Sequence, residues 1–178
     1  MIRHIRKGPG RARLDVRHAL ESLFVAESLF GSPEVWIVSP WISDVPIIDN
    51  RGGQYAHLTT LGNKRILMSE ILVFMSSKFG TKVTVVISDH EWAFEFRTNL
   101  PRAFAEQKKS NLLNLVVKSQ YELHEKSITT KDWQVGGSMN FTKQGIEVRD
   151  EVVTIDNTSE SLAEAIIDLR NRFPWPTE

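Results

Sequence analysis

Two short runs that are apolar apart from Thr84, at positions 35–38 and 83–87, place the strongest constraint on what this chain can fold into. Both runs are rich in β-branched residues and end at polar residues, which is typical of a strand buried on both faces. Amphipathic helical patterns precede them at residues 14–30 and 65–78. Because a sheet that is apolar on both faces needs helices on both sides, this alternation predicts an α/β fold.

The second half of the chain adds further strands to this pattern. Helical spacing covers residues 92–108, with a break or restart near Pro101, and a closing helix is expected at 160–170. Four strand-like segments lie between these helices, at residues 112–117, 121–129, 133–136 and 151–155. The order of elements predicts a mixed, largely parallel sheet sandwiched by helices. Residues 44–63 form a connection long enough to suggest a functional or mobile loop.

The charge of the chain is zero in total but uneven along its length. It has 22 basic and 22 acidic side chains, so the whole-chain charge does not indicate a nucleic-acid binder or an acidic tail. Residues 1–18 contain six basic residues and one acidic residue, and the remainder carries the opposite excess. We therefore predict a basic N-terminal arm, residues 1–13, and a single domain, residues 14–178. The arm is either a segment that follows a phosphate backbone or a disordered terminus.

The absence of cysteine excludes several kinds of site. Disulfides, thiolate zinc sites, iron–sulfur clusters and cysteine nucleophiles all need a residue that this chain lacks. The motifs of metal-dependent nucleases and the Gly-rich loop of nucleotide hydrolases are also missing. No apolar stretch reaches the length of a membrane span, and the first residues are charged. We expect a cytoplasmic protein that has no membrane partner and uses neither a metal ion nor a cofactor.

The residue types needed for phosphoryl chemistry occur in the second half of the chain. His124 and Lys126 are two residues apart, so on a strand they face the same side. Ser138 and Asn140 have the same spacing, and Glu151 follows a short polar loop. A histidine or a lysine alone is usually a structural or solvated residue. Together, this ordered set supplies an imidazole, a fixed cation, hydrogen-bond donors and a carboxylate, which suits a site for a phosphate group.

In this order, the residues resemble the His-x-Lys signature of the phospholipase D superfamily, with its downstream Gly-Ser-x-Asn and later glutamate. The resemblance implies that His124 attacks phosphorus to form a phosphohistidine and that Glu151 orients its imidazole. It implies that Lys126 and Asn140 hold the nonbridging oxygens and that Ser138 adds a hydrogen bond. Gly137 is the glycine of this motif and is expected to be structural. Lysine and amide donors stabilise phosphoryl charge without a metal ion.

The chain departs from the family pattern at one position. The family has an aspartate five residues after the lysine, where this chain has Lys131, and Asp132 follows one residue later. The segment with Ser138 is also one residue closer to His124 than usual. A small shift in the turn between two strands would explain both differences. We assign Asp132 a structural role on this basis.

The chain carries one His-x-Lys motif, whereas the family's catalytic unit needs two that face each other. One motif forms the covalent intermediate and the other protonates the leaving oxygen. Family members with a single motif build the site across a twofold dimer interface. The resemblance therefore implies a homodimer with a composite active site.

The substrate class rests on weaker signals. Bacterial members with a single motif are mostly metal-independent nucleases, which favours nucleic acid, and DNA in particular, as the substrate. Ser39 and Trp41 follow the first buried strand, where ligands bind in such sheets, and Trp41 is either a base-stacking residue or a core or lid aromatic. Arg51, before two glycines, is either a phosphate contact or part of an exposed turn.

The segment Val38-Ser-Pro-Trp-Ile-Ser-Asp44 also resembles small phospholipase D-like proteins found with bacterial 7-deazaguanine DNA modification and restriction clusters. That resemblance implies a role in restricting DNA alongside other proteins of such a system. The favoured function is a metal-independent phosphodiesterase that acts as a DNA endonuclease in restriction or defence. The alternatives are a catalytically weak or inactive dimeric subunit that binds nucleic acid or acts as a scaffold, and a phospholipase.

Overall fold

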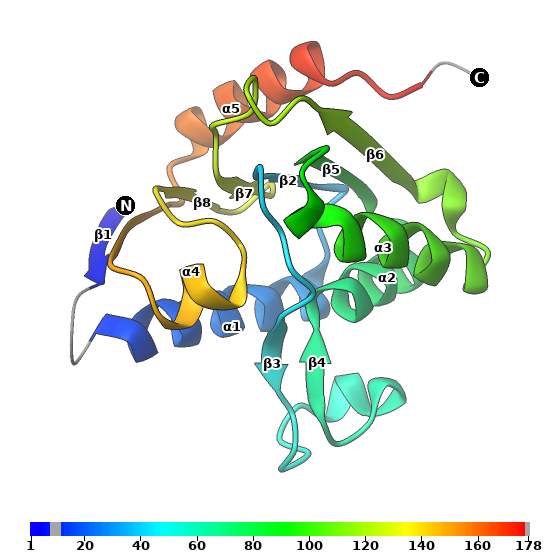
Figure 1. Ribbon diagram of the computed structural model, residues 1–178. Coiled ribbons are helices and arrows are strands. Elements are labelled where there is room, and N and C mark those ends of the chain that lie inside the picture. The colour runs from blue at the N-terminus through cyan, green and yellow to red at the C-terminus, as the bar shows by residue number, and fades with distance from the viewer. Residues whose placement is uncertain (8–11, 177–178) are drawn as a thin grey trace.

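The computed structural model describes residues 1–7 and 12–176, which form an α/β fold around a seven-stranded sheet in the order β1-β9-β8-β7-β2-β5-β6. The strands of this sheet are β1 (Ile2–Lys7), β2 (Glu34–Val38), β5 (Lys82–Ser88), β6 (Leu113–Lys118), β7 (Ser127–Thr129), β8 (Gln134–Gly137) and β9 (Glu151–Asp156). The α-helices are α1 (Ala12–Phe30), α2 (Met68–Phe79), α3 (Phe94–Glu106), α4 (Lys143–Glu147) and α5 (Ser159–Arg172). Helices α1 and α2 lie on one face of the sheet and α5 lies on the other (Figure 1). The predicted sandwich is therefore confirmed.

The sheet is mixed, as expected, but its parallel part is confined to one half. Strands β2, β5 and β6 are parallel, whereas β7, β8, β9 and β1 are joined by antiparallel ladders. The reason is the length of the connections, because a short turn such as the one between β7 and β8 can join only antiparallel strands. Antiparallel pairing therefore contributes more to the sheet than the sequence pattern suggested.

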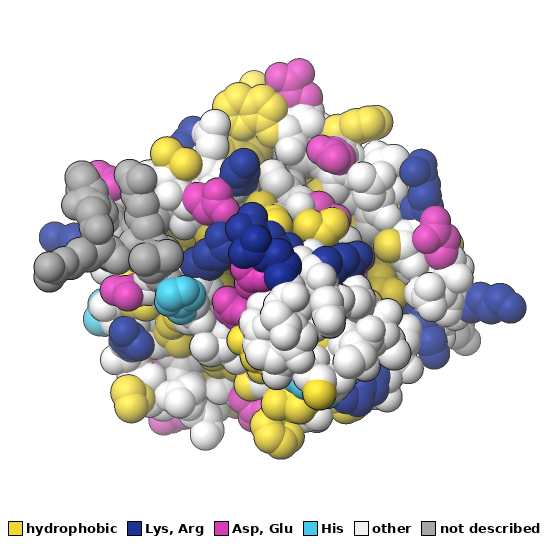
Figure 2. Space-filling model, turned by 90° about the horizontal axis from the view of Figure 1, so that it is seen from below, with side chains coloured by type: hydrophobic (Ala, Val, Ile, Leu, Met, Phe, Trp, Pro, Cys, Tyr) yellow, Lys and Arg dark blue, Asp and Glu magenta, His cyan; other side chains and the backbone are white. Residues whose placement is uncertain are grey.

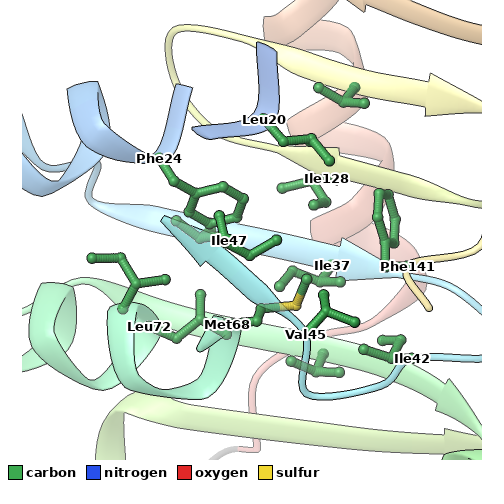
Figure 3. Close-up of a cluster of buried hydrophobic side chains, with 14 of the residues drawn as sticks. Leu20, Phe24, Ile37, Ile42, Val45, Ile47, Met68, Leu72, Ile128 and Phe141 are labelled. Atoms are coloured by element: carbon green, nitrogen blue, oxygen red, sulfur yellow. The ribbon is translucent and has the colours of Figure 1, made fainter. Parts of the chain in front are cut away.

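The core explains why β2 and β5 are apolar on both faces. Ile37 is fully buried beneath α1 and α2, and Figure 3 shows Leu20, Phe24 and Leu72 of these helices gathered around Ile37 and Ile128. On the other face of the sheet, Trp36, Val38 and Val86 pack in a second cluster with Leu169 and Phe173 at the end of α5. Burial of these side chains on both faces is the main stabilising contribution to the sheet.

The N-terminal segment differs from its prediction. Residues 2–7 form the edge strand β1, paired with β9 in a register that sets Ile2 opposite Asp156 and Lys7 opposite Glu151. Ile5 is buried, and the terminal amine donates to Oδ1 of Asn157 at 2.7 Å. This segment is therefore part of the sheet and not a separate arm, and its charged residues suit an edge strand, where they discourage further pairing. Of the other residues of the predicted arm, 8–11 lie outside the described residues, and residues 12–13 begin α1, so the predicted boundary falls inside this helix.

The connection predicted over residues 44–63 contains regular structure. Strands β3 (Pro46–Asp49) and β4 (Arg65–Leu67) form a two-stranded antiparallel sheet, with the 3-10 helix η1 (Ala56–Leu61) between them. This hairpin projects from the side of the molecule that carries α1 and α2 (Figure 1). Figure 2 looks at the molecule from that side, where basic side chains gather near the centre with acidic side chains between them.

Two further predicted elements have different limits. The helix expected over 92–108 is a 3-10 turn, η2 (Glu91–Ala93), followed by α3, and Pro101 lies inside α3 without ending it. A third 3-10 turn, η3 (Ser110–Leu112), precedes β6. The strand expected over 121–129 is reduced to β7.

Among the helices of the described residues, none is both long and apolar enough to cross a membrane.

Candidate active site

The register of the sheet brings four strand ends to one edge. Val38 at the end of β2 lies opposite Ser127 at the start of β7, and Ser127 lies opposite Gly136 near the end of β8. Gly137 in turn lies opposite Val153 near the start of β9. The residues just beyond these ends therefore lie at the same edge. They are Ser39, Lys126 and Ser138, and Glu151 joins them as the first residue of β9.

The His-x-Lys segment is an extended connection that leads into β7. Leu123 is buried in the cluster below α5, and Glu125 forms an ion pair with Arg172 of α5 at 2.8 Å. These alternate residues anchor the segment to α5, and His124 between them is exposed. The ammonium group of Lys126 donates to the backbone carbonyl of His124, which holds the lysine side chain against this segment.

Ser138 and Glu151 are in direct contact. The Ser138 hydroxyl donates to the carboxylate of Glu151 and accepts a hydrogen bond from the backbone N–H of Val152 at 3.0 Å. The backbone N–H of Ser138 donates to the carbonyl of Val152, also at 3.0 Å. The structure shows no hydrogen bond between Glu151 and His124, both of which it describes. Glu151 is therefore held by the serine at this edge of the sheet.

Gly137 has the backbone conformation that its predicted structural role requires. Its φ of +139° is one that side-chain-bearing residues rarely adopt. A Cβ atom at this position would lie 2.0 Å from the carbonyl oxygen of Val152. The glycine therefore allows β8 and β9 to approach each other just before Ser138.

Asn140 is buried and tied to the loop after β2. The hydroxyl of Ser39 contacts Oδ1 of Asn140 at 3.1 Å and the carbonyl of Trp41 at 3.0 Å. Ser39 is fully buried, and its contact with the Asn140 amide is the interaction that the structure gives it at this edge. An amide whose oxygen accepts from Ser39 keeps its NH₂ group as a donor for another partner.

Two of the predicted residues lie away from this edge. Arg51 is in the turn after β3, where its guanidinium donates to Asp49 at 2.7 and 2.9 Å. These bonds lower the pKa of Asp49 to about 2. Asp132 is in the turn between β7 and β8, at the opposite end of β7 from Lys126, and pairs with Lys131. Neither residue joins the group around His124, because each belongs to a turn at another part of the fold.

The fold of this chain is similar to the folds of several solved structures. No protein-family model and no curated protein matches the chain. A phospholipase D family member, Nuc from Salmonella typhimurium, superposes with a TM-score of 0.60 and 17% identity over 97% of this chain and 93% of its own. NucT from Helicobacter pylori gives a TM-score of 0.56 and 13% identity over 96% and 95%. This chain has the phospholipase D fold.

The phospholipase D fold predicted from the His-x-Lys motif is thus confirmed over nearly the whole chain. The same fold occurs within longer proteins, because a polyphosphate kinase from Porphyromonas gingivalis matches all of this chain with 24% of its own length. That match has a TM-score of 0.58 and 10% identity. The fold therefore appears in these structures both as almost a complete chain and as one part of a larger one.

Beside this edge, the phospholipase D fold of this chain carries a cluster of aromatic rings, formed by Trp41, His90 and Trp92. Of these, only Trp41 was predicted as a site residue. The ring centroids of Trp41 and Trp92 are 5.3 Å apart, and those of His90 and Trp92 are 5.1 Å apart. Trp41 and Trp92 line a cavity of about 350 Å³, together with Ser43, Thr142, Lys143, Gln144 and Arg149. A signal for Trp92 was present, since it follows the second buried strand much as Trp41 follows the first.

Within residues 1–7 and 12–176, no three His, Asp or Glu side chains are grouped so that they could hold a metal ion. The chemical groups at the edge are an exposed imidazole, an ammonium, a buried amide, and a carboxylate held by a hydroxyl. Such a set can bind a phosphate group and supply a nucleophile.

Proposed function

We propose that this chain is a metal-independent phosphodiesterase that cleaves nucleic acid, with DNA as the favoured substrate. One observation carries the proposal: the sheet register brings the segments of His124, Lys126, Ser138, Asn140 and Glu151 to one edge of a phospholipase D fold. The structures of Nuc, a phospholipase D family member, and of NucT match this chain almost end to end and support this proposal.

In the proposed reaction, an imidazole nitrogen of His124 forms a bond to phosphorus and the bond from phosphorus to the leaving oxygen breaks. The ammonium of Lys126 moves from the His124 carbonyl to the nonbridging oxygens, because a charged acceptor makes a stronger hydrogen bond. The NH₂ group of Asn140 donates to the same oxygens. Water then attacks the phosphohistidine, the bond from phosphorus to the His124 nitrogen breaks, and the second product leaves. The proton of the water passes to the group that protonated the leaving oxygen, which restores both partners.

Glu151 and Ser138 complete the proposed site. In this proposal the carboxylate of Glu151 accepts from the His124 ring and holds it in the orientation for attack. Its hydrogen bond from Ser138 positions the carboxylate, and the backbone of Val152 holds the Ser138 hydroxyl in turn. The exposure of His124 leaves its ring able to turn towards Glu151 when a substrate binds.

The leaving oxygen needs a proton, and we propose that His124 of a second copy provides it in a homodimer. Exposed apolar side chains near this edge support such an interface. Tyr121 is 81% exposed three residues before His124, and Val152 is 43% exposed next to Glu151. Pairing two copies at this edge would cover these side chains and bring two imidazoles to one phosphate.

We also propose that the protein acts in the cytoplasm, in DNA restriction or defence, together with other proteins of a modification system. The main alternative is a dimeric subunit that binds nucleic acid without cleaving it, and a phospholipase is a further alternative. The departure of Lys131 and Asp132 from the family pattern is the sequence feature behind the binding-subunit alternative.

The test is cleavage of plasmid and oligonucleotide DNA in excess EDTA by the wild type and by His124→Ala. Exposed His4, on β1, provides the matched control His4→Ala. We expect cleavage that resists EDTA in the wild type and the control, and a loss of at least about 1,000-fold in His124→Ala. Equal behaviour of His124→Ala and wild type, with DNA still bound, would establish the binding subunit instead. Hydrolysis of phosphatidylcholine without nuclease activity would establish the phospholipase.

A further inference from the structure

The cavity between Trp41, Trp92 and the segment 142–149 lies next to the proposed phosphate site and has no role in the proposed reaction. We propose that it binds an unpaired nucleobase of the nucleotide beside the scissile phosphate. This inference rests on the proposed function and specifies the substrate: a single-stranded or locally opened nucleic acid. The argument depends on the aromatic wall, the cationic wall and the link to Asn140.

The aromatic wall combines a fixed ring with an exposed one. Trp41 is half-buried, and its carbonyl oxygen lies 3.0 Å from the Ser39 hydroxyl, a contact that ties the loop after β2 together. Trp92 is 59% exposed and packs edge-on against Trp41, with the ring planes at 65°. His90 supports Trp92 from its own segment, since Nδ1 of His90 accepts from the Trp92 backbone N–H at 3.2 Å. An exposed indole on a supported turn presents a face on which a planar base can stack.

The opposite wall is polar and cationic. Lys143 and Arg149 are exposed, and in the part of the chain that the structure describes neither forms an ion pair with a carboxylate. Arg149 is held by the side-chain oxygen of Gln144 at 3.3 Å. Proteins that bind single-stranded nucleic acid combine aromatic rings with cations that follow the backbone in this way. The cations therefore favour a nucleotide over an uncharged apolar ligand.

The cavity is linked to the proposed phosphate site by two short connections. Trp41 is two residues from Ser39, which contacts Asn140, and Thr142 is two residues from Asn140 itself. The backbone N–H of Ser43 donates to the carbonyl of Phe141 at 3.0 Å, which joins the two loops between these points. A phosphate held by Asn140 therefore has the cavity beside it, at a position suited to the base of an adjoining nucleotide.

The geometry requires the base to be unpaired. A base within a duplex is covered on both faces by its neighbours, so it stacks on a protein ring only after it leaves the helix. A single strand offers its bases without that cost. DNA and RNA bases have similar aromatic faces, so the aromatic wall alone does not distinguish them, and both are included in the test.

The experiment measures binding of fluorescein-labelled oligonucleotides by fluorescence anisotropy. Protein carrying His124→Ala as a background keeps the substrates intact. The variants are Trp92→Ala, Trp92→Phe and the control Phe94→Ala, which removes a similarly exposed aromatic ring, at 58%, that does not line the cavity. The ligands are one sequence as single-stranded DNA, single-stranded RNA and duplex DNA, and a single-stranded DNA of abasic sites.

We expect Trp92→Ala to weaken binding of both single strands by roughly 5-fold to 100-fold, the loss that removal of one stacked base causes. Trp92→Phe should restore most of the affinity, and Phe94→Ala should bind as the parent protein does. The abasic strand should bind more weakly than the intact strand in the parent protein and should be insensitive to Trp92→Ala. Duplex DNA should bind more weakly than single-stranded DNA.

Equal losses on intact and abasic strands, or no loss on either, would overturn the base-binding role of the cavity. If Trp92→Ala weakens the binding of single-stranded DNA alone or of single-stranded RNA alone, the base-binding role of the cavity stands. The result would then also show which of the two sugars the site accepts. Hydrolysis of bis-p-nitrophenyl phosphate by the wild type reports the phosphodiesterase reaction without any base. Failure of that hydrolysis would overturn the proposed function, while the anisotropy data would still decide the question of base binding.

Discussion

The hydroxyl of Ser39 lies 3.1 Å from Oδ1 of Asn140, which joins two loops that are 101 residues apart in the sequence. Both residues are buried. This contact joins the loop after β2 to the loop after β8, and so connects the parallel half of the sheet to the antiparallel half at the candidate site. We therefore predict that Ser39 positions the Asn140 amide.

Replacement of Ser39 by alanine should lower the turnover of a phosphodiester substrate by roughly 10-fold, because the Asn140 amide loses the partner that orients it. We expect the loss mainly in kcat, with KM nearly unchanged. Ser76→Ala is the matched control, because its hydroxyl is also buried and donates to the Thr81 carbonyl, away from the site. Both variants should unfold at lower temperature, and an equal effect on turnover would argue against the positioning role.

Gly137→Ala should destabilise the fold by roughly 2–4 kcal/mol, because the added Cβ atom would meet the Val152 carbonyl and the backbone would be strained. Urea unfolding monitored by circular dichroism measures this change. Gly136→Ala is the control, since its Cβ atom would have ordinary contacts, the nearest at 3.7 Å from the Lys126 carbonyl. Similar losses in the two variants would contradict the close approach of β8 and β9 at Gly137.

Glu27 should make the stability of the fold depend on pH. Burial raises the pKa of this carboxyl in the folded state, so the folded chain keeps a proton that the unfolded chain releases. Wild-type stability should therefore fall as the pH rises from about 4.5, the ordinary pKa of the group, through the raised pKa. In Glu27→Gln the part of this decline that comes from Glu27 should be absent.

Urea unfolding at pH 4.5 and pH 7.5 checks this expectation. The advantage of Glu27→Gln over wild type should be larger at pH 7.5. The control is Glu106→Gln, which alters an exposed carboxyl at the end of α3 and should change stability little at either pH. An equal difference between Glu27→Gln and wild type at the two pH values would contradict the raised pKa.

Val152→Glu should weaken the proposed dimer by placing a charge in a surface that the second copy would cover. Light scattering coupled to size exclusion should show a shift from dimer to monomer, together with a loss of nuclease activity. Ile167→Glu is the control, because Ile167 is an equally apolar residue on α5 and is 58% exposed. A wild type that is monomeric at working concentrations would contradict the composite site.

The phospholipase D fold was predicted from a resemblance, because the order of His124, Lys126, Ser138, Asn140 and Glu151 is similar to the motif of that superfamily and can be read from the sequence. The edge strand β1 was not predicted, because its basic residues lack an apolar pattern and its structure depends on pairing with β9, more than 140 residues away. The hairpin of β3 and β4 was missed for a similar reason. Its strands are only four and three residues long.

The sequence alone determined the α/β class, the buried strands at 35–38 and 83–87, and the chemical types of the candidate site. These follow from local periodicity and from burial, which act along the chain. The tertiary structure decided that Ser39 contacts Asn140, that Arg51 and Asp132 lie elsewhere, and that Trp92 joins Trp41. Such contacts depend on strand register and on loops that meet only after folding, and no local pattern encodes the distance between them.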